Sequence, residues 1–164
     1  MEARFVRPAR TFREKFDFDS RMSMTNPSQL ALVWLHIVGN IIWIGSILAG
    51  AATTTGLSGD AKVRGELGLR IYRRLSVPAF VVSFLAGTIR LLMDTKYYLV
   101  EHHWMHGKLL FALIVIGIHH VIGGRAKKLA QGSVQDAGPT ATMAMAFLVS
   151  PVIASFFLIF RVPN

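Results

Sequence analysis

The chain has 164 residues, of which 52% are hydrophobic and 16% are charged, and it contains no cysteine. A soluble domain carries about a quarter of its residues as charges, so this composition argues against a soluble protein. The absence of cysteine excludes disulfides, thiolate metal sites and cysteine nucleophiles. We assign the net charge of +9 to membrane topology and to anionic lipid head groups rather than to nucleic acid.

Four apolar stretches have the length that a membrane helix needs, which is roughly 20 residues. We therefore predict an all-α integral membrane four-helix bundle. Its spans are expected at about residues 30–54, 77–93, 105–124 and 140–160. The bundle fills residues 27–164 as one domain. Residues 1–26 form a basic N-terminal tail, which lacks the apolar segment of a signal peptide.

The first span opens on a helix-start signal. Asn26 can cap the helix and Pro27 suits its first position, while Gly56 marks its end. Several small residues recur within the span, and these let another helix or a flat ligand approach the backbone closely. They are Gly39, Gly45, Ser46, Ala49 and Gly50.

The second span is entered through a basic helical segment, Leu67–Leu75, and carries Arg90 near its end. The connection that follows holds two tyrosines and a tryptophan, a set typical of a membrane interface. We expect the third span to end at Gly123 and Gly124. The fourth span contains Pro151 and has no charged or histidine ligand.

Ionisable residues inside a bilayer are functional candidates, and two of them lie near the same membrane face. In an alternating bundle the first and third spans begin on the same side, which we call side A. His36 lies about two turns into the first span and Lys108 lies in the first turn of the third, so both can flank one site. Arg90 ends the second span on that side.

The face of the first span that carries His36 suits a flat macrocycle. Gly39 and Trp43 share this face, as backbone clearance and as an aromatic platform. Haem iron takes an axial imidazole, and a neutral lysine can serve as the second ligand. Arg90 can bind a propionate carboxylate. The alternative is that His36 bonds a neighbouring helix and Lys108 extends to the interface, without a cofactor.

Other histidines offer competing assignments. His106, less than one turn from Lys108, is an alternative axial ligand, and His102–His106 has the composition of a copper, nickel or zinc loop. His119 and His120 lie near the opposite side B. No other ligand is expected at that depth, so we expect a packing role for this pair.

Several short motifs are similar to those of one family. They are Leu35-His36 followed by Trp43 and Gly45, the segment Arg70–Leu75, the run Trp104-Met105-His106-Gly107-Lys108-Leu109, and His119-His120. On these motifs the chain resembles the HemJ-type protoporphyrinogen IX oxidases, which are related to the CopD copper-resistance membrane domain. It departs from that family over Ile44–Ala51 and at Ile118.

The resemblance implies a haem b held by His36 and Lys108, and oxidation of protoporphyrinogen IX to protoporphyrin IX. The electrons would pass to a membrane acceptor such as quinone. We expect a bacterial inner membrane location, with a homo-oligomer or a larger membrane complex as open alternatives for assembly. Two other functions remain open: a non-catalytic subunit of an electron-transfer or photosynthetic complex, and a CopD-like copper-handling protein.

Overall fold

A computed structural model describes residues 26–56, 59–101 and 104–159 of the chain. The expected N-terminal tail, apart from Asn26, lies outside the described residues. Within them the structure is all-helical and has no strand, which confirms the all-α prediction. The elements are α2 (Pro27–Thr55), α3 (Ala61–Ile71), the π-helical turn η2 (Tyr72–Ser76), α4 (Val77–Met93), the π-helical turn η3 (Tyr97–Glu101), α5 (Trp104–Ala130) and α6 (Thr140–Ile159).

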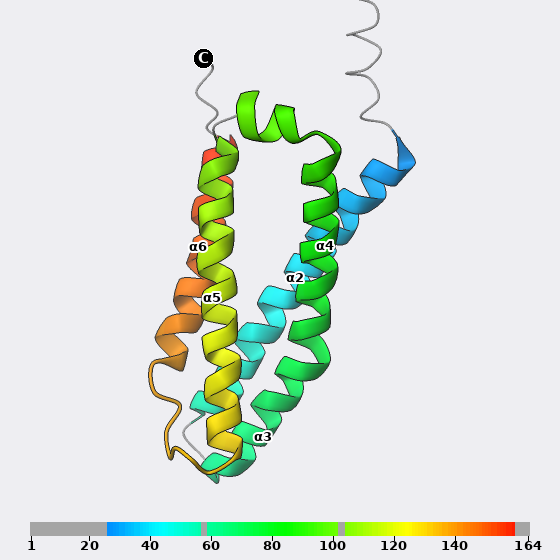
Figure 1. Ribbon diagram of the computed structural model, residues 1–164. Helices are drawn as coiled ribbons and strands as arrows, with labels where there is room; N and C mark the ends of the chain where they lie inside the picture. Colours follow the sequence, from blue (N-terminus) through cyan, green and yellow to red (C-terminus); the bar gives the residue numbers. More distant parts are fainter. Residues whose placement is uncertain (1–25, 57–58, 102–103, 160–164) are drawn as a thin grey trace, which may run out of the picture.

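The described helices run alternately in opposite directions (Figure 1). α3, η2 and α4 form one continuous helix, Ala61–Met93, which returns antiparallel to α2. η3 crosses the end of the molecule and leads into α5, which runs back toward the start of α3. α6 then returns beside α5. The start of α2 and η3 therefore lie at one end, side A, and the α5–α6 connection lies at the other, side B.

α2 packs against each of the other α-helices of the described structure. It contacts α3, α4, α5 and α6, whereas α4 and α5 make no extensive contact with each other among the described residues. Figure 1 shows these two helices standing apart, joined at side A by η3. α2 crosses obliquely behind α4, and its second half shows between α4 and α5.

Residues at the helix ends explain where the elements begin and stop. The Asn26 side chain accepts a hydrogen bond from the Ser28 amide at 3.0 Å, and Pro27 takes the first helical position as expected. Asp60 caps α3 in the same way through the Lys62 amide at 2.9 Å. α3 therefore starts earlier than the expected helical segment at Leu67.

The helix α5 is longer than the expected third span. It continues through Gly123 and Gly124 to Ala130. It ends where Gly132 adopts a φ of +69°, with its amide bonded to the Leu129 carbonyl and the Ser133 amide bonded to the Lys128 carbonyl. These two bonds form a Schellman motif, which satisfies the last carbonyls of the helix.

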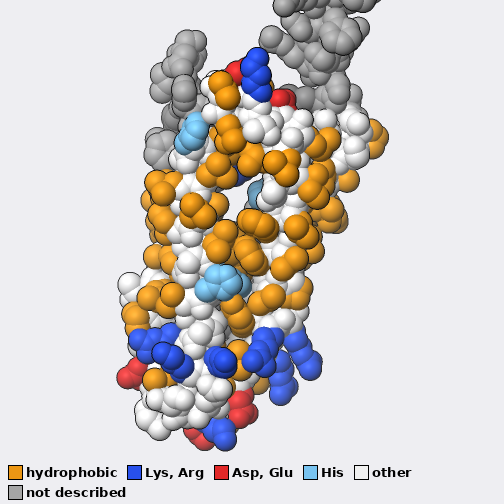
Figure 2. All heavy atoms as spheres, viewed as in Figure 1, with side chains coloured by type: hydrophobic (Ala, Val, Ile, Leu, Met, Phe, Trp, Pro, Cys, Tyr) orange, Lys and Arg blue, Asp and Glu red, His pale blue; other side chains and the backbone are white. Residues whose placement is uncertain are grey.

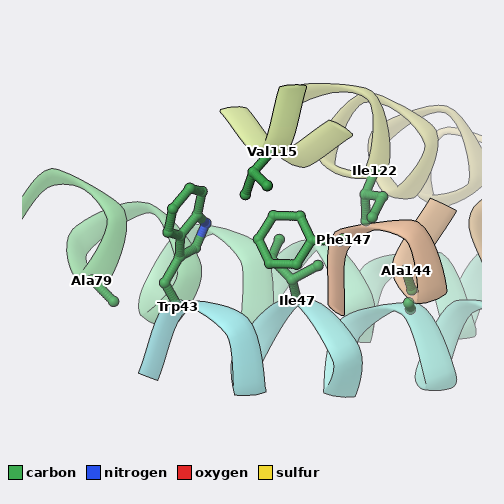
Figure 3. Close-up of a cluster of buried hydrophobic side chains, with 8 residues drawn as sticks. Trp43, Ile47, Ala79, Val115, Ile122, Ala144 and Phe147 are labelled. Carbon is green, nitrogen blue, oxygen red and sulfur yellow. The ribbon is translucent and has the colours of Figure 1, made fainter. Parts of the chain in front are cut away.

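The core lies where α2, α4, α5 and α6 converge. Its buried apolar side chains are Trp43, Ile47, Ala51, Ala79, Val115, Ile122, Ala144 and Phe147. Figure 3 shows Trp43 and Ile47 rising from α2 toward Val115 and Ile122 on α5, with Phe147 of α6 beside them. Phe147 is fully buried and packs edge-on against Trp43, with 5.2 Å between the ring centroids.

The outer surface is apolar over most of its length. Figure 2 shows hydrophobic side chains covering the middle of the molecule and basic side chains collected toward side B. Three described helices are long and apolar enough to cross a membrane: Pro27–Thr55, Ala61–Met93 and Trp104–Ala130. This pattern is compatible with a membrane protein.

Candidate functional site

The imidazole of His36 lies against the backbone of α4. Its Nδ1 is 2.8 Å from the Ser83 carbonyl oxygen. A carbonyl can only accept a hydrogen bond, so Nδ1 carries the proton and donates it. The second ring nitrogen, Nε2, is then the acceptor, and the Asn40 amide nitrogen lies 3.2 Å from it. The ring is thereby fixed in one tautomer and one orientation.

Two glycines allow this close approach of α2 and α4. A Cβ on Gly87 would lie 2.7 Å from His36 Nδ1, and a Cβ on Gly39 would lie 2.9 Å from the Ser83 Cβ. Neither distance is tolerated by a real side chain. Gly87 therefore makes the room for the imidazole, and Gly39 makes the room for α4 itself.

Ser83 joins these groups into one polar network. Its hydroxyl lies 3.0 Å from the His36 carbonyl oxygen and 2.8 Å from Asn40 Oδ1. The hydroxyl is buried, so its bonds to α2 satisfy a polar group that would otherwise be costly to place between helices. Ser83 is not among the residues predicted from the sequence to lie at the site. The sequence feature that could have identified Ser83 is the spacing of Ala79, Ser83 and Gly87, which are small residues four apart on one helix face.

Lys108 lies near the start of α5 and is partly buried. His36 and Lys108 are 72 positions apart in the chain and come from α2 and α5. Their common site stays a prediction from the alternation of the spans.

The space between α4 and α5 is open at this level. Figure 2 shows the surface hollowed there, with histidine and basic colours visible inside the hollow. We call this the α4–α5 hollow: α4 and α5 form its sides and η3 its side-A end.

Arg90 lies at the side-A end of the same wall. It is in the last turn of α4, and its guanidinium carbon is 5.3 Å from the centre of the Tyr98 ring in η3. A guanidinium over an aromatic face is attracted to the ring. Arg90 thus links α4 to η3.

Trp43 takes a position different from the expected platform beside His36. Its indole N–H donates to His119 Nδ1 at 2.9 Å, and its ring packs on Phe80 at 4.9 Å. Both Trp43 and His119 are buried in the core. His119 Nε2 has no hydrogen-bond partner among the described residues, and its ring lies between Tyr72 and Phe80. The packing role expected for this histidine agrees with these contacts.

His106 lies on an exposed part of α5. The other histidines of the expected metal loop, His102 and His103, are outside the described residues. Within the described ranges, no group of three or more His, Asp or Glu side chains is placed to hold a metal ion.

No family model, curated protein or solved structure matches this chain. Function must therefore be argued from the arrangement of the side chains. That arrangement offers one imidazole of fixed orientation on α2, an amine near the start of α5, and a guanidinium in the last turn of α4. Imidazole and a neutral amine are ligands of transition metals, and a guanidinium binds carboxylates.

Proposed function

We propose that this protein is a four-helix integral membrane protein that binds haem b, and that His36 and Lys108 would hold its iron. The observation that carries the proposal is the orientation of the His36 imidazole, whose Nδ1–H is held by the Ser83 carbonyl on α4. The sequence places Lys108 near the start of α5, in its first turns. Three long apolar helices and the apolar helix α6 support membrane insertion. A bacterial inner membrane is the proposed location.

The state of His36 fits an iron ligand. Histidines that bind metals through one ring nitrogen usually donate the other N–H to a carbonyl or carboxylate, which fixes the ring and raises its basicity. The bond from Nδ1 to the Ser83 carbonyl is of this kind. Ligation through Nε2 requires the Asn40 amide to turn aside, and its contact of 3.2 Å is at the long end of a hydrogen bond.

Lys108 and Arg90 would serve different parts of the cofactor. Lys108 binds iron only as a neutral amine, and its partly buried place in α5 limits its contact with water. Arg90 is assigned to a carboxylate of haem or substrate, because a guanidinium binds a carboxylate through two parallel hydrogen bonds. Gly39 and Trp43 would not touch the cofactor. Gly39 allows α2 to pack closely against α4, and Trp43 packs in the core.

The proposed activity is the oxidation of protoporphyrinogen IX to protoporphyrin IX. It rests on the resemblance carried by Leu35-His36 and by the Trp104–Leu109 run. Each pair of hydrogen atoms removed from the substrate reduces one membrane quinone to a quinol, which balances protons and electrons. A bound haem supplies one-electron transfer between these molecules. The chain's residues hold it, orient it and exclude water from it.

The first test is the absorption spectrum of the full chain purified in mild detergent. A Soret band with a b-type pyridine hemochrome supports the proposal. No Soret band after haem supplementation would remove it, and bound copper would favour the CopD-like alternative.

The second test is complementation of a bacterium that lacks protoporphyrinogen oxidase. Growth without added haem supports the oxidase activity. A well-expressed, haem-loaded protein that fails to complement would instead indicate a subunit of a larger electron-transfer complex.

A further inference from the structure

Six basic side chains gather at side B on two helical stretches that pack together. We call them the basic belt: Arg70, Arg73, Arg74, Arg125, Lys127 and Lys128. All are exposed except Arg125, which is partly exposed. Figure 2 shows Lys and Arg side chains across this end of the molecule, beyond the apolar middle. The proposed haem function does not use them.

Backbone packing brings the two halves of the basic belt to one depth. Gly65 lies directly against the backbone of Ala130, and the Tyr72 ring lies directly against Gly123. These contacts fix the antiparallel register of the Ala61–Met93 helix and α5. Arg70, two residues before Tyr72, is therefore level with Arg125, two residues after Gly123. The backbone packing contacts hold Arg70 and Arg125 at the same level although their like charges repel each other.

Among the described residues no ion pair neutralises the basic belt, and Glu66 and Asp136, two acidic residues at side B, make none. Among the described residues the one ion pair joins Lys96 to Glu101, in the side-A connection. The Arg125 guanidinium is directed at the α5–α6 connection, where its carbon lies 3.0 Å from the position a Cβ on Gly138 would take. Like charges held at one depth repel each other, so an external anion at this place would stabilise the packed helices.

Apolar side chains adjoin the belt on its bilayer side. Leu75 follows the α3–η2 arginines and is 51% exposed, and Val121 precedes Arg125 on α5 and is 45% exposed. By the same register these two residues lie close to one level. A ligand that satisfies both features has an anionic head and apolar chains.

We propose that the basic belt is a binding site for anionic phospholipid, with its phosphate on the arginines and its acyl chains along Leu75 and Val121. Juxtamembrane basic clusters attract such head groups, and guanidinium groups bind phosphate through paired hydrogen bonds. The site shares with the proposed function only the placement of the helices in a bilayer. It does not depend on haem.

The test is thermal unfolding of the full chain in mild non-ionic detergent, with phosphatidylglycerol or phosphatidylcholine titrated in. Phosphatidylglycerol should raise Tm in a salt-sensitive manner, and phosphatidylcholine should not. The double variant Arg70→Gln/Arg125→Gln should bind phosphatidylglycerol about fivefold more weakly for each charge removed. Without added lipid it should unfold at or above the wild-type temperature, because the repulsion is gone.

Matched variants make the result decisive. Lys96→Gln removes an exposed lysine at side A and should leave the lipid response unchanged. If the arginine variant fails to fold, the double variant Lys127→Gln/Lys128→Gln tests lipid binding by the basic belt instead. An equal response to phosphatidylcholine, to inorganic phosphate or to nucleic acid overturns the proposal, as does an unchanged response in both belt variants. Soret absorbance read in the same samples tests the haem proposal separately.

Discussion

His36 and Gly87 depend on each other. The imidazole occupies the space where any other residue at position 87 would place its Cβ, 2.7 Å from Nδ1. A glycine on one helix therefore sets the orientation of a histidine on another. The bond from His36 to the Ser83 carbonyl exists because this space is empty of side chain.

Gly87→Ala should displace the imidazole and abolish most haem binding while the protein still folds. The measurement is Soret absorbance per protein, together with thermal unfolding. The matched control is Gly117→Ala on α5, where a Cβ would meet nothing within 4 Å. Equal haem content in both variants would contradict the role of the Gly87 gap.

The axial ligand assignment predicts unequal effects at two positions. His36→Ala should lose most of the bound haem, because it removes the ligand held by α4. Lys108→Met should retain part of it with a shifted spectrum, since a thioether can also ligate iron. His120→Ala, an exposed histidine on α5, is the control and should change neither quantity. If His106→Ala gives the spectral shift expected of Lys108→Met, His106 is the ligand instead.

Replacing Asn40 should change haem affinity in the opposite direction to replacing His36. The Asn40 amide nitrogen contacts His36 Nε2, the nitrogen that iron would take. Asn40→Ala should therefore raise haem affinity, or at least preserve it, although it removes the Asn40–Ser83 hydrogen bond. Haem titration of the apoprotein measures this. A loss of haem as complete as that of His36→Ala would show that Asn40 supports ligation rather than competing with it.

The hydrogen bond between Trp43 and His119 should support stability rather than haem binding. Trp43→Phe removes the donor and leaves both nitrogens of a buried imidazole without a partner, which costs about 1–3 kcal/mol. Thermal unfolding in detergent measures the loss. Trp34→Phe, at a side chain 61% exposed, should cost under about 0.5 kcal/mol. The double variant Trp43→Phe/His119→Phe should lose less than the sum of its single variants.

Membrane orientation can be read with single cysteines, because the chain has none of its own. The balance of basic residues near the spans weakly favours side B in the cytoplasm. In intact spheroplasts, Ser133→Cys at side B should be protected from an impermeant thiol reagent. Thr95→Cys at side A should react. Both positions are exposed. The reverse pattern would place His36 and Lys108 in the cytoplasmic half of the bilayer.

The positions of the helices were predictable from hydropathy and from local end signals. Asn26, Pro27 and Gly56 mark the first helix because capping and ring geometry act within a few residues. The common depth of His36 and Lys108 follows from the alternation of the spans alone. The helix α5 continues past Gly123, the expected end of the membrane span, and the missing side chain of Gly123 makes room for Tyr72.

The contacts between helices could not be predicted in the same way. Lipid accepts any apolar face, so hydropathy does not fix the rotation of a helix about its axis. That rotation decides whether Gly39 faces a ligand or Ser83, and whether Trp43 faces the hollow or His119. Small residues four apart on α4 carried the missing information.

The shared contacts of α2 bear on how the protein is assembled during synthesis. α2 is the first described helix to leave the ribosome, and it touches α3, α4, α5 and α6. Each later helix can therefore pack against a helix that has already been synthesised. α4 packs against α2, and α6 packs against α2 and α5. α4 and α5, which follow one another in the chain, need no direct pairing. The chain can add helices in order of translation without waiting for a later segment to complete an earlier contact.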